Sequence, residues 1–334
     1  MCLGVSIRDT DRNFRATFRS ECDERMTVPA AAPSSLHFRV GRRVVRLSNV
    51  DKVLYPAADF TKGDVIRYYA RIARVVLPHL RGRPMTLKRY PDGVDGGCFY
   101  EKRCPSHRPT WIGTIRHDRD KSSDGIDYCR INDVASLLWL ANLASLELHP
   151  LLAKAPHLDR PTHVVFDLDP GAPAGVIEAA EIAIGLRDLL SDLGLASFAK
   201  TSGGKGIHLA VPLNTKVTFD DTKRFARAVA HLMERRMPDR VVSKMSKTLR
   251  NGKVLIDWSQ NDSHKTTAAV YSLRARQRPT VSTPVTWKEL ESAVRRRDEF
   301  ALIFGAQEVL DRVASKGDLF EQVFKLRQKL PTNI

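Results

Sequence analysis

The sequence predicts an α/β protein with mixed α+β sheets, because short apolar runs alternate with longer segments of helical periodicity along most of its 334 residues. Three segments carry this prediction. The run VVFDLDP, Val164 to Pro170, has the composition of a buried strand, and the segment Ala174 to Leu195 that follows it reads as an amphipathic helix. The run VLID, Val254 to Asp257, is again an apolar strand that ends in an acidic residue.

Charge is the unusual feature of the composition. Lys and Arg together number 54, against 38 Asp and Glu, which gives a formal net charge of +16. A protein this basic usually binds a polyanion, most often a nucleic acid. A generally basic proteome or a need for solubility would give the same balance without such a partner.

Cysteine usage and hydropathy bear on the compartment. The five cysteines contain no CxxC pair, so we expect reduced thiols and neither a disulfide framework nor a zinc site. No run reaches the ~18–20 apolar residues of a membrane span, and the N-terminus lacks the apolar stretch of a secretion signal. We therefore expect a cytoplasmic protein that does not bind membranes.

The chain is expected to fold from His37 onward. Residues 1–36 show no sustained period and end in Ala, Pro and Ser, so they are interpreted as a disordered tail or an overlong start. From His37 the pattern predicts a β-hairpin with its turn near Gly41 and Arg42.

A helix is predicted after this hairpin, with Thr61 as its N-cap and Asp64 three residues further on. Lys52 precedes the helix and Lys62 lies in its first turn, where a cation opposes the helix dipole. An anion docked at the helix N-terminus would explain both lysines. For any single lysine, a solvated surface position is the more common explanation.

The segment from Gly82 to Ile112 is rich in turns, cations and aromatic residues. Phe99 and Tyr100 lie beside a basic EKR sequence, a combination that suits stacking on nucleic-acid bases next to phosphate contacts. Core packing is the alternative, and we expect it for one of the two rings. The segment Ile126 to Pro150 then reads as a strand and a buried apolar helix that starts near Asn132 or Asp133, with Glu147 and His149 as minor site candidates near its end.

Asp167 and Asp169 end the VVFDLDP strand with one residue between them. Because side chains alternate along a strand, both carboxylates project from the same face. They repel each other unless a cation lies between them, and carboxylates at a strand end commonly hold Mg²⁺ or Mn²⁺ against phosphates. Asp257 would add the third carboxylate that a two-metal site requires. A helix N-cap or a surface turn is the alternative interpretation.

A glycine-rich turn joins two predicted strands downstream, in the sequence SGGKGIH. It is not a Walker A loop, because GxxxxGK[ST] is absent and no helix follows. Its glycines would let a phosphate approach closely, while Ser202, Lys205 and His208 supply a hydroxyl, a cation and an imidazole. A lone histidine in a strand is otherwise often structural.

The remaining elements complete the α/β pattern. A helix is predicted to begin near Asp220 or Asp221. A hairpin with a basic turn at Asn251-Gly252 is predicted to follow it and to end at Asp257. The C-terminal residues read as helices, and the chain shows no internal repeat.

In chain order, DLDP, SGGKGIH and VLIDWSQN resemble the three catalytic motifs of the archaeo-eukaryotic primase superfamily. More closely, the chain resembles the polymerase (primase-polymerase) module of bacterial ATP-dependent DNA ligase D, the enzyme of Ku-dependent non-homologous end joining. Nine blocks carry this resemblance: LSNVDKVLYP, TKGD, GRPMTLKRYPDGVDG, FYEKR, LASLELHP, VFDLDPG, TSGGKGIHL, KTLRNGKVLIDWSQN and YSLRAR. The ligase motif KxDGxR is absent, so the chain is interpreted as a stand-alone homologue or an excised module without ligase activity.

The resemblance implies a role for each matching residue. Two divalent ions, Mn²⁺ or Mg²⁺, would be bound by Asp167, Asp169 and Asp257. The substrate NTP or dNTP would be bound by Ser202, Lys205 and His208, with Lys247, Gln260 and Arg274 as neighbours. The 5′-phosphate of a DNA gap or break would be bound by Asn49, Lys52 and Lys62. Phe99 and Tyr100 would stack on the template, although the family often has two phenylalanines there.

The predicted fold is therefore a primase-like core with two sub-regions flanking a cleft. Within the domain 37–334, residues 37–161 would grip DNA ends and residues 162–334 would hold metals and nucleotide. The expected reaction is template-directed nucleotidyl transfer with ribonucleotides preferred, in a monomer that works with Ku and a DNA ligase. A metal-dependent nuclease and a non-catalytic DNA-end-binding protein are the alternatives. If the reaction depends on added nucleoside triphosphate, the nuclease is excluded. If a product forms only with metal, the non-catalytic binding protein is excluded.

Overall fold

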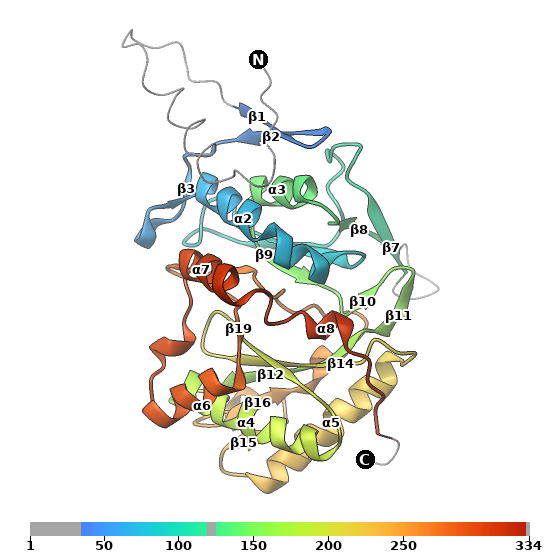
Figure 1. Cartoon of the computed structure of the whole chain (residues 1–334), viewed down its shortest axis with the longest axis vertical. Helices are drawn as coiled ribbons and strands as arrows, with labels where there is room; N and C mark the ends of the chain where they lie inside the picture. Colours follow the sequence, from blue (N-terminus) through green and yellow to red (C-terminus); the bar gives the residue numbers. More distant parts are fainter. Residues whose placement is uncertain (1–34, 119–124, 332–334) are drawn as a thin grey trace.

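The computed structural model describes residues 35–118 and 125–331, and it confirms a mixed α/β fold built around two sheets, one in each half of the molecule (Figure 1). Of the predicted tail, residues 1–34 lie outside the described residues, whereas Ser35 and Leu36 belong to the first strand. Among the described residues, no helix is both long enough and apolar enough to cross a bilayer.

The first half of the chain forms a five-stranded sheet centred on β5. Its strands are β5 (Pro84–Arg89), β6 (Phe99–Glu101), β7 (Thr114–His117), β8 (Ile126–Arg130) and β9 (Ser145–Pro150). Helices α2 (Lys62–Leu80) and α3 (Val134–Asn142) lie over it. Smaller elements flank it, namely β1 (Ser35–Val40), β2 (Arg43–Ser48), β3 (Val53–Tyr55), η1 (Pro56–Ala58) and β4 (Phe60–Thr61).

The second half forms a six-stranded sheet in the order β15-β16-β12-β14-β13-β19. Its strands are β12 (His163–Pro170), β13 (Phe198–Thr201), β14 (Ile207–Pro212), β15 (Val241–Val242), β16 (Val254–Asp257) and β19 (Pro284–Val285). Its helices are α4 (Val176–Asp192), α5 (Phe219–Arg236) and α6 (Trp287–Arg296). The connecting elements are β10 (Ala153–Lys154), β11 (His157–Pro161), η2 (Lys247–Leu249), η3 (Trp258–Gln260), β17 (Leu273–Ala275), β18 (Pro279–Val281) and η4 (Phe300–Leu302).

The C-terminal helices α7 (Ala306–Lys316) and α8 (Gln322–Lys325) connect the two halves, because α7 packs on α2 and α8 packs on β14. Asp318 lies between these helices. It accepts a hydrogen bond from Tyr271 Oη at 2.8 Å and lies 2.9 Å from His79 Nε2 at the end of α2. One hydrophobic cluster runs through both halves. The division into residues 37–161 and 162–334 stays a prediction.

Strand β12 shows why the sheet has one apolar and one polar face. Val164, Phe166 and Leu168 are completely buried, and the Phe166 ring packs against Phe225 of α5 with the ring centroids 6.5 Å apart. Since side chains alternate along a strand, Asp167 and Asp169 must project from the opposite face. That face is turned toward the first half of the molecule (Figure 1).

Several predicted boundaries are confirmed. Strands β1 and β2 form the predicted hairpin, with Val40 paired to Arg43 across its turn. A capping box at the start of α2 joins Thr61 and Asp64. Helix α3 begins after Asp133, as predicted.

The start of α5 shows a small difference. Its N-cap is Thr218, and Asp221 closes the capping box from inside the helix. The Thr218 hydroxyl, two residues before Asp220, therefore caps the helix. Asp220 and Asp221 both lie in the first turn, where negative charge is favourable to the helix dipole.

The predicted hairpin at Asn251-Gly252 is wrong. Strand β15 pairs with β16 in parallel, so the basic segment between them crosses over instead of turning back. Gly252 does adopt the left-handed conformation, with φ +67°, but its N–H donates to Ala172 O in another loop. The Asn-Gly turn is therefore local, and it packs against the loop after β12.

The predicted helix up to Pro150 is also too long. Helix α3 ends at Asn142, and Glu147 and His149 lie on strand β9. Ala144 has φ +54°, which breaks the helix. All residues of β9 are buried, including the polar residues that alternate with its leucines, so the strand continues the apolar run of the helix without a solvent-exposed face.

The prediction of reduced thiols is wrong for one pair, because Cys104 and Cys129 form a disulfide. They are 25 residues apart and not in a recognisable motif. Cys104 N–H donates to Asp127 O, so the loop is hydrogen-bonded onto β8 beside Cys129. Cys98 is free and exposed, whereas Cys2 and Cys22 lie outside the described residues.

Asn261 completes the hydrogen bonding of β12 where no strand does. It is fully buried, accepts from Val165 N–H at 2.8 Å and donates to Val165 O at 2.7 Å. Asn261→Ala should lower the free energy of unfolding by about 2–4 kcal/mol, because two buried backbone groups lose their partner. Urea unfolding measures this.

Asn142→Ala is the matched control for that measurement. Asn142 bridges Ser48 N–H and Arg46 O in the same way, but near the surface. Water can replace that bridge, so the cost there should stay below about 1 kcal/mol. Equal losses for both variants would contradict the role given to burial.

Candidate active site

One row of polar side chains crosses four strands of the second sheet. Lys200 on β13 pairs with His208 on β14, His208 pairs with Asp167 on β12, and Asp167 pairs with Asp257 on β16. Directly paired residues of antiparallel strands project to the same face, so these four side chains lie in line. Asp169 follows Asp167 on that face, two residues further along β12.

A pocket of about 220 Å³ opens in front of this row. Seven predicted site residues line it, namely Asp167, Asp169, Ser202, Lys205, His208, Gln260 and Arg274. Lys247 does not line it and lies exposed in η2. Asp257 lies beside Asp167 through the strand register without reaching the pocket wall.

The carboxylates of this row repel each other. Burial, and next the charges of Asp257 and Asp169, raise the pKa of Asp167 to about 7. Asp167 Oδ1 lies 3.3 Å from His208 Nε2. A cation placed here would relieve the repulsion that raises this pKa.

The other two carboxylates already hold partners. Asp169 Oδ2 accepts from Arg250 at 3.3 Å. Asp257 accepts from the backbone and hydroxyl of Ser259 and from Gln260 Nε2, within 2.9 Å. In the described chain, no three His, Cys, Asp or Glu side chains are gathered into a ready metal site. The oxygen donors suit Mg²⁺ or Mn²⁺, and a carboxylate has about four lone-pair sites, so an ion would be bound beside these existing partners.

The glycine turn is held together by Ser202. Its Oγ accepts from the N–H groups of Gly204 and Gly206, at 3.2 Å and 3.1 Å. Gly203 has φ +75°, and a Cβ there would come within 2.5 Å of Arg274 Cγ, so only glycine fits. Lys205 is exposed at the tip of the turn. The turn therefore presents the Lys205 ammonium, whereas the Gly204 and Gly206 amides point inward to Ser202.

Arg274 ties the turn to the first half of the molecule. Its Nη1 donates to Ser202 O at 2.7 Å, and its Nε lies 3.2 Å from Glu147 Oε2. Burial alone would raise the pKa of Glu147, but the hydrogen bond from His149 and the Arg274 charge outweigh it, so the pKa is lowered. Glu147 is thus an ionised anchor that positions Arg274 and His149.

Arg276 and Lys200 are site or row residues that the sequence did not single out, whereas His149 was expected only as a minor candidate. Arg276 stands in the basic stretch that follows the third motif. Lys200 and His149 are buried polar residues in short strands, and only the register shows which strands lie beside them. The alternation of SLELHP was the one available signal for His149, because it spaces Glu147 and His149 on one face.

Lys52 and Lys62 lie together at the start of α2. Lys62 is 7% exposed, and its Nζ donates to Ser48 O at 2.7 Å. Burial, and next the charges of Lys52 and Arg89, lower its pKa to about 8. Lys52 Nζ is paired with exposed Asp92 at 2.8 Å. Asn49 precedes both, with φ +51°, and accepts from the Lys52 N–H.

The predicted anion site at this helix end stays a prediction, but the first amides of the helix have partners within the protein. Lys62 N–H donates to Lys52 O and Gly63 N–H donates to Val50 O. Asp64 N–H donates to Thr61 Oγ1 in the capping box. These three amides already have partners, so any anion bound here would have to contact the lysine ammonium groups.

Phe99 and Tyr100 are both exposed, at 45% and 59%, so the expectation that one of them packs in the core is wrong. They lie on edge strand β6 and point to opposite faces. The Arg89 guanidinium lies 5.2 Å from the Phe99 ring centroid, and Lys88 Nζ lies 5.6 Å from that of Tyr100. Each ring has a cation near it and is exposed, so each can stack on a ligand.

Comparison with solved structures defines the class of fold. The polymerase domain from Mycobacterium tuberculosis ligase D, solved in complex with DNA, superposes on this chain with a TM-score of 0.78. The two chains are 42% identical, and the match covers 84% of this chain and 98% of the other.

Sequence comparisons agree. The multifunctional non-homologous end joining DNA repair protein LigD of Mycobacterium tuberculosis is 43% identical over 291 residues, which are 84% of this chain and 37% of that protein. LigD of Mycolicibacterium smegmatis is 44% identical over 279 residues, 82% of this chain and 35% of that protein. A model of the LigD primase-polymerase domain matches residues 61–320. The chain belongs to this domain family, and it spans just over a third of the length of these relatives.

Proposed function

We propose that this chain is a template-directed nucleotidyltransferase that fills or extends DNA ends during non-homologous end joining. The observation that carries the proposal is the convergence of Asp167, Asp169 and the Ser202–Lys205–His208 turn around one pocket, with Asp257 paired beside Asp167 on the next strand. The DNA in the solved relative, and the net charge of +16 here, support a nucleic-acid substrate.

In this proposal, Asp167, Asp169 and Asp257 hold two divalent ions, Mn²⁺ or Mg²⁺. The raised pKa of Asp167 supports this, because it reports carboxylate repulsion that a cation would relieve. When bound, such ions activate the attacking hydroxyl and neutralise the leaving phosphates. The protein itself positions the groups: Lys205, His208 and Arg274 face the triphosphate, with Gln260 beside them. Lys247 would join them only if η2 moves.

DNA contacts are assigned to the first half of the chain. Lys52 and Lys62, with Asn49 beside them, would bind the 5′-phosphate of a gap or break. Phe99 and Tyr100 would stack on the template, each from its own face of β6, and both rings are accessible for this. By its resemblance to ligase D, we expect a preference for ribonucleotides and cooperation with Ku. A DNA ligase would have to seal the product, because KxDGxR is absent from this sequence.

Primer extension on a gapped duplex with a 5′-phosphate tests the proposal. We expect products that lengthen by added nucleotides and that require both a divalent ion and a nucleoside triphosphate, with NTPs competing successfully against dNTPs. Shortened products without added triphosphate would indicate a nuclease instead. Binding of the DNA without any metal-dependent product would indicate a non-catalytic end-binding protein.

Lys205→Ala should raise the nucleotide concentration for half-maximal extension about tenfold, the effect of one lost charge-assisted contact. The rate at saturating nucleotide should change less. Lys288→Ala removes an equally exposed lysine on α6 and should leave both quantities unchanged. Identical nucleotide titrations for the two variants would show that the glycine turn is merely structural.

A further inference from the structure

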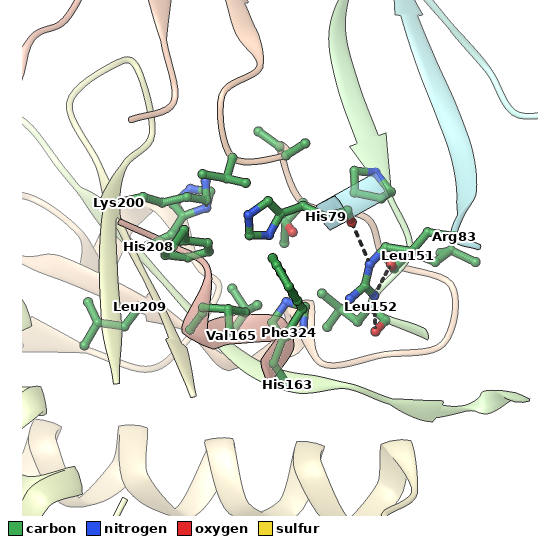
Figure 2. A pocket seen from close by; sticks show the side chains of 18 residues that line it. His79, Arg83, Leu151, Leu152, His163, Val165, Lys200, His208, Leu209 and Phe324 are labelled. Atoms are coloured by element: carbon green, nitrogen blue, oxygen red, sulfur yellow. Dashed lines mark hydrogen bonds between the residues drawn. The ribbon is translucent and has the colours of Figure 1, made fainter. Parts of the chain in front are cut away.

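Lys200 is a buried cation that the proposed reaction does not use. It is 5% exposed on β13, and it lines a cavity of about 50 Å³ behind the row of polar side chains, not the 220 Å³ pocket in front. Figure 2 shows Lys200 and His208 side by side at one wall of this cavity, with His79 and Arg83 further across. His208 lines both spaces, so it links Lys200 to the pocket by direct contact.

The hydrogen bonds around Lys200 have a defined direction. Ser282 Oγ donates its single proton to Thr201 O at 2.9 Å, so it must accept from Lys200 Nζ, which lies 2.6 Å away. Burial, and next the Arg274 charge, lower the pKa of Lys200 to about 7, so the ammonium form predominates below that pH. In this form the lysine has three donors and no acceptor. The contact of 3.1 Å between Lys200 Nζ and His208 Nδ1 is therefore one in which the lysine donates and the imidazole accepts.

This direction decides where His208 carries its proton. A ring nitrogen that accepts a hydrogen bond carries no proton, so the ring is the neutral imidazole and not the imidazolium. A neutral imidazole has one N–H, and an accepting Nδ1 leaves the proton on Nε2. Nε2 lies 3.3 Å from Asp167 Oδ1, so this N–H faces a carboxyl oxygen that can accept it.

We propose that Lys200 is a positioning residue that fixes His208 as its Nε2–H tautomer. The N–H then points toward Asp167 in the free protein, and toward a phosphate oxygen when a nucleoside triphosphate occupies the pocket. The second half of this statement rests on the proposed function, whereas the first half concerns the free protein alone. Without the lysine, the ring loses the contact that excludes the Nδ1–H tautomer.

The tautomer is measurable without DNA, metal or nucleotide. Long-range proton–nitrogen NMR correlations on protein with ¹⁵N-labelled histidine distinguish the two ring nitrogens, and His208→Gln assigns the signal. At about pH 6, below the pKa of Lys200, we expect the Nε2–H pattern in the wild type. Lys200→Met, which keeps the length of the side chain and removes the donor, should give a mixture or the Nδ1–H form. An Nδ1–H pattern in the wild type would overturn the proposal, even if no variant folds.

Two variants separate positioning from general damage. Lys200→Arg keeps a donor, and the adjoining cavity gives the larger group room, so the Nε2–H pattern should return. Lys205→Met removes a cation at the pocket and should leave the pattern unchanged. An unchanged tautomer in a folded Lys200→Met protein, checked by its melting curve, would show that Lys200 does not fix the ring.

The link to the nucleotide has its own readout. Lys200→Met should raise the half-saturating nucleotide concentration about tenfold, with a smaller change in the rate at saturation, and Lys200→Arg should restore most of it. A changed tautomer with unchanged nucleotide use would overturn the triphosphate contact but not the tautomer assignment. If no extension occurs in the wild type, the proposed function fails and the NMR result stands by itself.

Discussion

Asp167→Asn is expected to reduce primer extension about a thousandfold or more. The change removes one charge from the row of carboxylates with almost no change in shape. Losing a metal ligand should raise the activation barrier by several kcal/mol, and each 1.36 kcal/mol is tenfold in rate. Retention of more than about a tenth of the activity would contradict the assignment of Asp167 to the metal site.

The same variant should be more stable than the wild type in metal-free buffer near pH 7.5. The folded-state pKa of Asp167, about 7, lies above its unfolded value of about 3.9, so folding favours the protonated form. The stability of the wild type therefore falls as the pH rises through this interval. Asparagine does not titrate and avoids that loss. We therefore expect the free energy of unfolding of the variant to exceed that of the wild type by about 1–3 kcal/mol, a difference that disappears toward pH 4.

Thermal melts with and without Mn²⁺ complete this test, because an ion that binds the folded state raises its stability. The ion should stabilise the wild type more than Asp167→Asn. Asp262→Asn is a matched control with the opposite sign: Asp262 is bound by Lys223, and its pKa is lowered although burial opposes this. That variant should lose a little stability at neutral pH and keep its extension activity. Equal Mn²⁺ shifts in wild type and Asp167→Asn would remove Asp167 from the metal site.

The sequence predicted the two acids of β12 correctly because strand alternation is a local property. The sequence pattern did not show which residue lies opposite Asp167 on the neighbouring strand. Asp257 was assigned from an apolar strand that ends in an acid, and again through the family resemblance, while the segment before it suggested a hairpin that does not exist. Its position opposite Asp167 depends on the antiparallel pairing of β16 with β12, while β15 takes the sheet edge beside β16. Residue periodicity does not encode that order of strands.

Lys200 and His149 show the same limit more sharply. Each is a buried polar residue in a short strand, and each gains its meaning from a contact: Lys200 from His208 on the neighbouring strand, and His149 from Glu147 on its own strand. The sequence placed Phe99 and Tyr100 beside cations but could not predict their exposure, because edge strands and central strands share a composition. The partners of the first α2 amides could not be predicted either, because they come from the loop at Val50 to Lys52.

Removing both Lys52 and Lys62 should cost on the order of a hundredfold or more in affinity for gapped DNA that carries a 5′-phosphate. Each charge-assisted contact is worth about 1.5–3 kcal/mol. Since the amides of α2 have partners within the protein, the two ammonium groups must provide the discrimination. Lys62→Met keeps the buried stem of that side chain, and Lys52→Ala removes an exposed one.

A competition titration at one fixed salt concentration compares the double variant and the wild type on DNA with and without the terminal phosphate. Lys216→Ala/Lys288→Ala removes the same charge from two exposed positions elsewhere, and should weaken binding to both DNAs alike.

The pH dependence gives an independent check on Lys62. Burial and the nearby cations lower its pKa to about 8, so in the free protein the ammonium form is lost as the pH rises past 8. The preference for phosphorylated ends should therefore fall between about pH 7 and 9 in the wild type. In Lys62→Met the remaining preference should not change over this range. If the double variant loses equal affinity for both DNAs, these lysines belong to a diffuse basic surface, and recognition of the end must lie elsewhere.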